Sequence, residues 1–255
     1  MPEGPEIYLM CKEFRKQFLN KTLKSIKFLS GKYIKDDKQP KNYAAFEKAL
    51  KSKIKVVGCK GKFMYLILEN NWTVFITFGL TGHIVYEKDN HSHIEFDFND
   101  KKAYISDQLK FGTITFYEGC EQLNKKLNEL GPDPLSDESS SAEALWLKKI
   151  TSKTNQKKAI GEVLLNQKIN AGVGNYIRAE VLYILKWNPF RPVSSLNLKD
   201  LNELWITLVK YMKQSVDNHY KKRNDFKVYE NKDAQRDELC KGRFIWWDPK
   251  VQTKK

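Results

Sequence analysis

Residues 166–176 read Asn-Gln-Lys-Ile-Asn-Ala-Gly-Val-Gly-Asn-Tyr, a glycine-rich break between two stretches of helical periodicity. Apolar residues recur at helical spacing before the break, over residues 157–168, and after it, over residues 175–186. Gly172 and Gly174 allow backbone conformations that strain other residues, so a tight turn is expected over residues 170–174. The stretch therefore predicts two helices joined by a turn, the second of which ends before Asn188 and Pro189.

This turn has two interpretations. The backbone N–H groups of a glycine-rich turn can approach a phosphate, and the N-terminus of the helix that follows favours an anion. An ordinary connection between two antiparallel helices would have the same composition. The choice between them needs the rest of the sequence.

Helical character continues on both sides of the turn. Residues 198–216 carry a regular apolar stripe formed by Leu201, Leu204, Trp205, Leu208, Val209, Met212 and Val216. The residues from 226 onward contain strand-like aromatic runs, which predict a terminal hairpin. Upstream, Gly131-Pro-Asp-Pro134 breaks the chain, and residues 136–141 form a polar linker whose end could cap a helix.

The first half of the chain has mainly strand periodicity. Residues 5–19 predict a helix with Ile7, Phe14 and Phe18 on one face. Between residues 22 and 117 strands are expected at 63–68, 73–77 and 93–98, and a short helix near 42–51. We therefore expect an α+β chain of three domains: a β-sandwich flanked by helices over 1–130, a helical domain over 131–225 and a hairpin over 226–255.

The composition favours a polyanionic partner. The 255 residues include 45 Lys and Arg against 31 Asp and Glu, which gives a net charge of +14. Over residues 221–255 basic residues outnumber acidic ones eleven to six and alternate with aromatic side chains, as on surfaces that bind phosphates and stack bases. A solvated surface with buried hairpin aromatics would have the same composition, so charge alone leaves nucleic-acid binding open.

Other residue classes exclude several kinds of site. The sequence has no run of about 18 apolar residues, so no membrane span and no membrane partner are expected. The four cysteines (Cys11, Cys59, Cys120 and Cys240) include no Cys-x-x-Cys pair, which argues against a disulfide framework and a two-pair zinc site. The four histidines are too dispersed for a metal site and are expected on the surface or in loops: His83, His91, His93 and His219.

The N-terminal residues Pro2 and Glu3 form a candidate nucleophile and proton donor. Removal of Met1 would leave Pro2 with a secondary α-amine. An α-amine titrates near pH ~8 and a lysine near ~10.4, so roughly a few hundredfold more of the α-amine is neutral at pH 7. Attack on a sugar C1′ would form an iminium, with Glu3 donating a proton to the ring oxygen. The alternative is a proline in the first turn of a helix whose acidic residues favour the helix dipole.

Six short motifs occur in an order that resembles the formamidopyrimidine-DNA glycosylase/endonuclease VIII family. They are Met1-Pro-Glu-Gly-Pro-Glu-Ile7, Lys60-Gly-Lys-Phe63, Phe78-Gly-Leu-Thr-Gly82, Ser106-Asp-Gln-Leu-Lys-Phe-Gly112, Leu130-Gly-Pro-Asp-Pro-Leu135 and the stretch from Asn166 to Glu180. The third and fourth motifs resemble loops that enter DNA, and the last resembles the helix–two-turn–helix of the family. Each motif is short, but together they span nearly the whole chain.

The resemblance implies a bifunctional DNA glycosylase and AP lyase of base excision repair. Such an enzyme removes oxidised bases through a Schiff base and then cleaves the strand by β,δ-elimination. By this resemblance Pro2 is the nucleophile and Glu3 the proton donor, Glu6 assists base excision, and Lys62 serves the elimination. Arg243 in the terminal finger would hold the phosphates beside the flipped nucleotide and assist the second elimination.

The resemblance also implies which residues bind DNA. They are Leu80 and Phe111 in the two loops, Lys168, Gly174 and Asn175 at the helical turn, and Arg243 in the finger. Domain 131–225 would then be the DNA-binding helix–two-turn–helix domain, and 226–255 its finger. No cofactor is implied.

The terminal finger departs from the family pattern. Residues other than Cys or His occupy the four expected positions of the zinc ligands: Asp233, Asp237, Asp248 and Val251. Cys240 alone cannot form a structural zinc site, which takes four Cys or His ligands. We therefore expect no metal and a zincless finger held by the packing of Phe244, Ile245, Trp246 and Trp247.

Two further departures concern the substrate. Leu80 and Phe111 could fill the space left by an extruded base, but Leu109 stands where the family carries an arginine that contacts the orphaned base. Leu80 and Leu109 could also be ordinary loop or core leucines. We hypothesise weak opposite-base preference and activity on single-stranded DNA. Members of the family specialised for 8-oxoguanine carry a longer loop at the place of residues 213–227, so the resemblance implies oxidised pyrimidines, hydantoins and formamidopyrimidines as substrates here.

Two other functions remain open at this stage. A catalytically idle protein of the same fold could bind damaged or single-stranded DNA, and an RNA-binding protein would share the positive charge. On the main interpretation the partner is damaged DNA, double- or single-stranded, and the protein is a monomer. It would then be intracellular and lie with DNA, in a nucleus or an equivalent compartment of a virus or a host.

Overall fold

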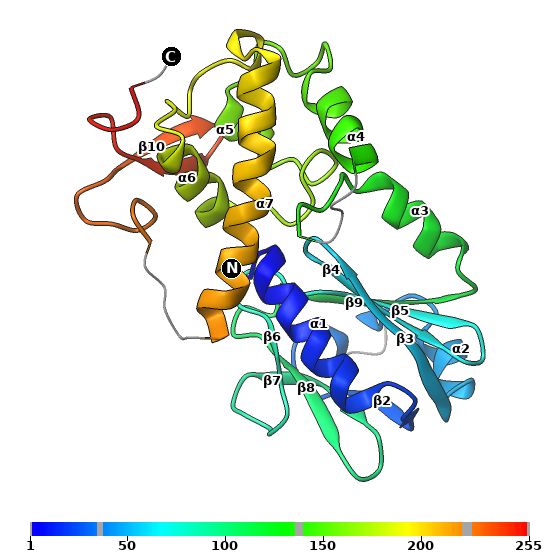
Figure 1. Cartoon of the computed structure of the whole chain (residues 1–255). Helices are drawn as coiled ribbons and strands as arrows, with labels where there is room; N and C mark the ends of the chain where they lie inside the picture. Colours follow the sequence, from blue (N-terminus) through cyan, green and yellow to red (C-terminus); the bar gives the residue numbers. More distant parts are fainter. Residues whose placement is uncertain (1, 35–37, 136–139, 221–225, 254–255) are drawn as a thin grey trace. The chain divides into compact units, whose positions relative to one another are not determined.

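The computed structural model describes residues 2–34, 38–135, 140–220 and 226–253 (Figure 1). They form two compact units, each with its own hydrophobic core. One unit holds Pro2 and Glu6–Asn128, and the other holds Glu3–Pro5 and the chain from Glu129 onward. The division at the N-terminus matters for the site, because Glu3–Pro5 make their contacts in the second unit.

The first unit contains two antiparallel sheets that share one core with two helices. The five-stranded sheet has the order β1-β3-β4-β5-β9, with β1 (Thr22–Leu23), β3 (Ser52–Lys60), β4 (Phe63–Leu68), β5 (Trp72–Thr77) and β9 (Thr113–Glu118). The four-stranded sheet has the order β2-β7-β8-β6, with β2 (Ser25–Phe28), β7 (Ser92–Asp97), β8 (Lys102–Ser106) and β6 (His83–Val85). The helices are α1 (Gly4–Phe18) and α2 (Tyr43–Lys48).

Helix α1 buries the face that its periodicity predicts. Ile7, Cys11, Phe14 and Phe18 are all buried, at the three- and four-residue spacing that places side chains on one side of a helix. The Phe18 ring stacks on Phe98 with centroids 4.1 Å apart. The expected helix over 5–19 is thus confirmed, and so are the three expected strands.

The second unit is helical and ends in a hairpin. Its elements are α4 (Ser140–Ile150), α5 (Ile160–Val163), α6 (Asn175–Ile184), α7 (Leu198–Tyr220) and the strands β10 (Gln235–Cys240) and β11 (Arg243–Trp247), while α3 (Glu121–Glu129) precedes it. Helix α6 packs against α7 and β11, and its residues from Tyr176 to Leu182 are all buried (Figure 1). The prediction of an α+β fold with a terminal hairpin is confirmed.

The helix expected over residues 157–168 is wrong in length. Only Ile160–Val163 forms α-helix. The late start is tertiary, because the N–H groups that would extend the helix back toward Lys157 bond elsewhere: Ile160 donates to the carbonyl of Arg191 at 2.8 Å and Gly161 to that of Pro189 at 3.0 Å. After Val163 the chain continues in short turns.

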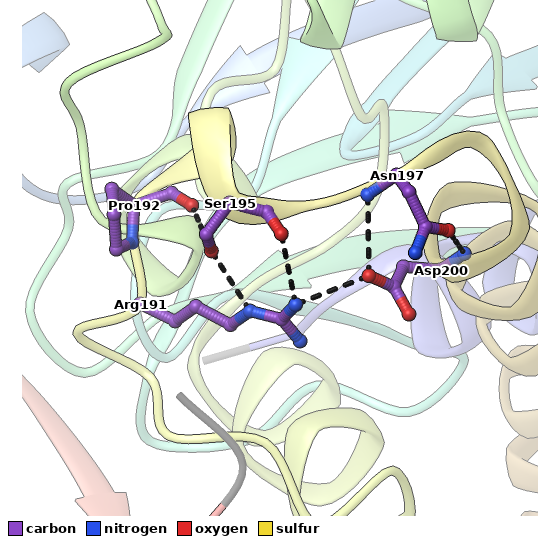
Figure 2. Close-up of polar contacts among 5 residues, drawn as sticks. All are labelled: Arg191, Pro192, Ser195, Asn197 and Asp200. Atoms are coloured by element: carbon purple, nitrogen blue, oxygen red, sulfur yellow. Dashed lines mark hydrogen bonds and ion pairs between the residues drawn. The ribbon is translucent and has the colours of Figure 1, made fainter.

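A polar cluster fixes the start of α7 (Figure 2). The side chains of Asn197 and Asp200 accept hydrogen bonds from each other's backbone N–H groups, at 2.9 and 3.2 Å, which is a capping-box arrangement. Arg191 donates to Asp200 at 3.1 Å and to the Ser195 carbonyl at 3.0 Å. The Arg191 side chain is only 9% exposed, so this ion pair anchors the helix at a position with little access to solvent.

Two expectations concern the connections between elements. Most of the stretch 213–227 is helix, because α7 continues to Tyr220, and residues 221–225 lie outside the described residues. Residues 136–139 of the expected linker also lie outside them, and α4 begins at Ser140. Within the described ranges no helix is long and apolar enough to cross a membrane.

Candidate functional site

Glu3 lies buried at the N-terminus of α6. Its Oε1 accepts a hydrogen bond from the N–H of Tyr176 at 3.0 Å, and its Oε2 accepts one from Ile177 at 3.3 Å. The carboxylate is 2% exposed and satisfies two of the N–H groups that the first turn of a helix leaves without intrahelical partners. The anion at this helix end is therefore Glu3 itself, and a DNA phosphate expected at the turn would have to bind other donors.

The glycine-rich turn before α6 packs against the backbone of residue 4. Gly4 donates to the Gly172 carbonyl at 2.9 Å, and a Cβ on Gly4 would lie 3.1 Å from the Gly172 Cα. Gly172 has a φ of +92°, a conformation that suits glycine. Glu3 and Gly4 therefore both bond at this turn or at the helix that follows it, and Gly174 is the N-cap of α6.

The remaining predicted residues of the turn lie at its edges. Asn175 is the first residue of α6, is half-buried, and accepts a hydrogen bond from Arg178 at 3.1 Å. Lys168 is exposed between α5 and α6, and its carbonyl accepts a bond from Lys149 at 2.9 Å. Glu3, Gly174 and Asn175 are therefore brought together, whereas Lys168 lies on the approach to the turn.

Three predicted catalytic residues belong to the first unit. Pro2 precedes α1 and Glu6 lies in its first turn; both are half-buried. Lys62 lies with Gly61 in the turn between β3 and β4, where Gly61 has a φ of +55°. The left-handed glycine allows Lys60 and Phe63 to pair across this short turn.

The loops expected to enter DNA lie side by side at one edge of the first unit. Residues 78–82 lead from β5 to β6, and residues 107–112 lead from β8 to β9. Because β5 pairs with β9 and β6 with β8, both loops cross between the sheets at the same place. A Cβ on Gly79 would lie 2.9 Å from the Gly112 nitrogen.

These loops expose an apolar cluster, which we call the wedge: Leu80, Leu109 and Phe111. Their exposed fractions are 39%, 45% and 59%. The interpretation of Leu80 and Leu109 as core leucines is therefore wrong. Exposed apolar side chains on adjoining loops are typical of a surface that contacts a ligand or inserts into it.

Asp107 holds the two loops together. It is fully buried, accepts a hydrogen bond from the Thr81 hydroxyl of the first loop, and accepts bonds from the N–H groups of Leu109 at 3.2 Å and Gly112 at 2.9 Å in the second. Burial acts to raise the pKa of Asp107, but these hydrogen bonds outweigh it and the pKa is lowered. An ionised acceptor thus sets the shape of the wedge.

His93 is a buried residue, which corrects the expectation of a surface or loop position. It occupies a bulge of β7, opposite β8, and is 2% exposed. Neither of its ring nitrogens has a hydrogen-bond partner among the described residues. Burial lowers the pKa of His93, while Asp107 acts to raise it and Lys110 to lower it. His83, His91 and His219 are exposed, as expected.

Arg243 begins the second strand of the terminal hairpin and is exposed. The turn before it is Lys241 and Gly242, both with positive φ. Arg178 of α6 donates to the carbonyl of Phe244, the residue that follows Arg243. The strand that presents Arg243 is therefore attached to the same helix that carries Asn175.

The hairpin is held by polar and apolar contacts. Asp237 accepts a bond from the Trp247 indole at 2.7 Å, and Glu180 of α6 accepts bonds from three successive N–H groups, those of residues 227–229. Ile245 is buried as expected, but Phe244 is 39% exposed and lies under the Arg236 guanidinium. Within the described part of the chain no three His, Cys, Asp or Glu side chains are grouped to hold a metal ion, so the hairpin does not fit a zinc site.

Sequence reasoning did not identify Arg178, Asp107 or Glu180. Arg178 and Glu180 are buried charges inside motif 166–180, where an arginine and a glutamate would ordinarily face solvent. Their apolar surroundings, from Tyr176 to Leu182, are visible in the sequence and could have indicated burial.

Two family models match this chain. Residues 1–114 match the formamidopyrimidine-DNA glycosylase N-terminal domain, and residues 130–225 match the formamidopyrimidine-DNA glycosylase H2TH domain. The matches include Glu3, the wedge and the turn before α6.

Curated relatives carry the same name. A formamidopyrimidine-DNA glycosylase of Bacillus cereus is 28% identical over 224 residues, covering 85% of this chain and 78% of the relative. That of Carboxydothermus hydrogenoformans is 28% identical over 247 residues, covering 94% of this chain and 87% of the relative.

Solved structures show the same fold. The MutM (Fpg) protein of Thermus thermophilus has a TM-score of 0.82 at 22% identity, with full coverage of both chains. Lactococcus lactis Fpg (MutM), solved in complex with DNA containing an oxidised pyrimidine, has a TM-score of 0.83 at 20% identity, with 99% of this chain and 100% of that chain covered.

Proposed function

Because this chain belongs to the formamidopyrimidine-DNA glycosylase/endonuclease VIII family, we propose that it excises oxidised bases from DNA and then cleaves the strand at the abasic site. It is a DNA glycosylase of DNA repair, and DNA is its partner. The AP-lyase step, the lesions and the roles of individual residues are the proposal. The observation that carries it is the anchoring of Glu3, next to Pro2, on two backbone N–H groups of α6.

Pro2 is the proposed nucleophile. Removal of Met1 leaves a secondary amine whose nitrogen attacks the sugar C1′ while the bond from C1′ to the base breaks. Glu3 takes the proton that the amine releases and donates it to the ring oxygen, so that the bond from C1′ to this oxygen breaks and the sugar opens to an iminium. The anchored carboxylate supports this assignment, since two backbone N–H groups of α6 fix the position of the residue next to Pro2 in the sequence.

The later steps are assigned to Glu6, Lys62 and Arg243. Glu6 assists departure of the base. Lys62 lies in the turn between β3 and β4 and serves the elimination of the 3′ phosphate. Arg243 is exposed on a strand that is attached to α6, which suits a guanidinium that binds phosphates and assists loss of the 5′ phosphate.

DNA binding is assigned to the wedge and the helical turn. Leu80 and Phe111 fill the space left by an extruded base, which costs a few kcal/mol in lost stacking. Lys168, Gly174 and Asn175, with Arg243, contact the backbone. Leu109 offers no hydrogen bond to an orphaned base, which supports weak opposite-base preference and activity on single strands.

The substrate range proposed is oxidised pyrimidines, hydantoins and formamidopyrimidines, in paired or unpaired DNA. We also propose three regions of distinct role, with chemistry in 1–130, DNA binding in 131–225 and phosphate contact from the finger in 226–255. The protein is proposed to act inside the cell, in the compartment that holds the DNA. It is also proposed to act as a monomer, which sedimentation with and without an oligonucleotide would check.

Borohydride trapping tests the chemistry. Reduction of the iminium should join protein and lesion-containing DNA covalently, and peptide mass analysis should place the adduct at Pro2. A variant with one residue inserted before Pro2 converts the amine to an amide and should form no adduct. Pro5→Ala, which leaves the Pro2 amine intact, is the matched control. DNA binding without any adduct from the unmodified protein would favour the alternative, a catalytically idle DNA-binding protein.

A further inference from the structure

Arg178 is a buried cation where three elements of the second unit meet. Its side chain is 0% exposed. Nη1 donates to the carbonyl of Gly161 on α5 at 2.8 Å, and Nη2 donates both to Asn175 Oδ1 at 3.1 Å and to the carbonyl of Phe244 on β11. One guanidinium therefore ties α5, the first residue of α6 and the finger hairpin together.

The positive charge of Arg178 has less compensation than is usual for a buried arginine with a purely structural role. Within the described residues no carboxylate lies at ion-pair distance from it, and its buried Nε has no hydrogen-bond partner. Burial lowers the pKa of Arg178 to about 10, an effect that Glu3 opposes and Arg243 reinforces. The side chain is still charged at neutral pH. A buried charge of this kind is expensive, and packed apolar side chains could join the same elements at lower cost.

The contacts of Arg178 orient two groups that the proposed function assigns to DNA phosphates. An amide has one oxygen, and that of Asn175 is engaged by the guanidinium, so its N–H groups remain to donate elsewhere. Phosphate oxygens accept hydrogen bonds but do not donate them. The second contact holds the carbonyl of Phe244, adjacent to Arg243, so it fixes the start of the strand that presents this exposed guanidinium.

We propose that Arg178 is a positioning residue that sets the Asn175 amide and the Arg243 strand, together, for contact with the DNA backbone. Arg178 touches no DNA itself. The inference rests on the proposed function, which assigns Asn175 and Arg243 to phosphates. It adds that the two contacts depend on each other through one buried side chain.

The first variant is Arg178→Lys, which keeps the positive charge but loses the paired N–H donors of the guanidinium. A lysine presents a single point of charge and cannot bond the amide and the carbonyl in the same geometry. The matched control is Arg191→Lys. Arg191 is also a little-exposed arginine of the second unit that bonds a side chain and a carbonyl, but its partners anchor α7 and include no proposed DNA ligand (Figure 2).

The first measurement is the salt dependence of binding to a duplex that contains a tetrahydrofuran abasic analogue. Each phosphate contact contributes a slope of about −0.9 to the plot of log K against log salt concentration. Arg178→Lys should make the slope shallower by the amount that about one to two phosphate contacts contribute. Arg191→Lys should lower the melting temperature by a similar amount but leave the slope unchanged. A purely structural role for Arg178 would not change the slope of the folded protein.

The second measurement is a double-mutant cycle. Asn175→Ala should weaken binding strongly in the unmodified protein and in Arg191→Lys, but little further in Arg178→Lys, because the amide is already misplaced. The same preparations acting on an abasic oligonucleotide should show more product arrested after the first elimination in Arg178→Lys than in the control, since Arg243 is proposed to assist the second.

Equal salt slopes for Arg178→Lys and Arg191→Lys, or additive effects of Asn175→Ala and Arg178→Lys, would overturn the inference. If Arg178→Lys does not fold, Arg178→Gln, a neutral donor, takes its place under the same control. Failure of the proposed chemistry would be seen separately, as the absence of a borohydride adduct with the unmodified protein, because the binding slopes require no catalysis.

Discussion

The backbone N–H of Gly4 donates a hydrogen bond of 2.9 Å to the carbonyl oxygen of Gly172. Beside it, the Glu3 carboxylate caps α6 through Tyr176 and Ile177. Two motifs that lie far apart in the sequence are thereby joined, and a Cβ on Gly4 would lie only 3.1 Å from the Gly172 Cα.

Replacement of Gly172 by alanine should impair catalysis more than it impairs folding. Its φ of +92° strains any residue with a Cβ, at about 1–3 kcal/mol. Gly119→Ala is the matched control, since Gly119 has a φ of +76° and lies in the first unit away from this contact. Both variants should lower the melting temperature, but only Gly172→Ala should slow lesion excision, by roughly tenfold or more. Equal losses of activity would contradict this expectation.

Glu3→Gln should abolish base excision and spare cleavage of a preformed abasic site. Loss of a general acid costs roughly 10²–10⁴ in rate, whereas an abasic sugar opens by itself and still meets the Pro2 amine. The amide also faces a backbone N–H with its own N–H₂, which costs about 1–3 kcal/mol of stability. Glu180→Gln is the control, because Glu180 is a buried carboxylate that accepts three backbone bonds from residues 227–229. Glu180→Gln should lose stability but keep base excision. If instead Glu180→Gln abolished excision and Glu3→Gln kept it, Glu180 and not Glu3 would be the proton donor.

Leu109→Arg should increase the preference for duplex DNA. The Leu109 side chain is 45% exposed. The bonds to Thr81 and Asp107 come from its backbone N–H, so the substitution should leave the shape of both loops unchanged. An arginine there can donate to an orphaned base. The ratio of duplex to single-strand cleavage should rise several-fold for identical lesions. Gln108→Arg adds the same charge at the adjacent exposed position, and an equal rise there would show an effect of charge alone.

His93 should make the protein less stable in mild acid. Burial lowers its pKa, with Asp107 opposing and Lys110 reinforcing the shift. The unfolded state, with a histidine pKa near ~6.5, therefore binds a proton that the folded state does not, and stability falls as the pH drops through that value. His93→Gln should flatten the melting temperature between about pH 7 and pH 5. The exposed His91→Gln serves as control, and a flattening of the same size there would assign the effect elsewhere.

Asp107 should support the wedge down to low pH. Its pKa is lowered, because hydrogen bonds from Thr81, Gly112 and Lys110 outweigh the effect of burial. Its contribution to stability is therefore fully present above about pH 4 and is lost only as the pH falls through the lowered value. Asp107→Asn should cost about 1–3 kcal/mol, since one amide N–H₂ replaces an acceptor, and should reduce duplex cleavage more than cleavage of single strands. An equal reduction on both substrates would separate Asp107 from base extrusion.

Periodicity predicted those elements whose burial follows the local pattern. The α1 face with Ile7, Cys11, Phe14 and Phe18, the alternation in β4 and the stripe of α7 are all visible as spacing, because one side of each element faces a core. The motifs also identified which stretches of the chain to examine for a site. Their assigned roles stay proposals.

Partners that lie far apart in the sequence decided the remainder. The α5 helix begins late because Ile160 and Gly161 donate to Arg191 and Pro189, and His93 is buried because residues 92–96 of its strand are covered on both faces. Neither effect has a local signal. The hairpin combines both: its aromatic sequence predicted packing, which Ile245, Trp246 and Trp247 show, but Phe244 is exposed and further attachment comes from Arg178 and Glu180.

By itself, the sequence determined the α+β class, the order of the motifs and the residue types available for chemistry, since these follow from spacing and side-chain identity. Only the tertiary structure decided that Glu3 caps α6, that Asp107 joins the two wedge loops and that Arg178 ties Asn175 to the finger. The physical reason is that a buried charge needs hydrogen-bond partners, and those partners come from whichever backbone the fold brings near.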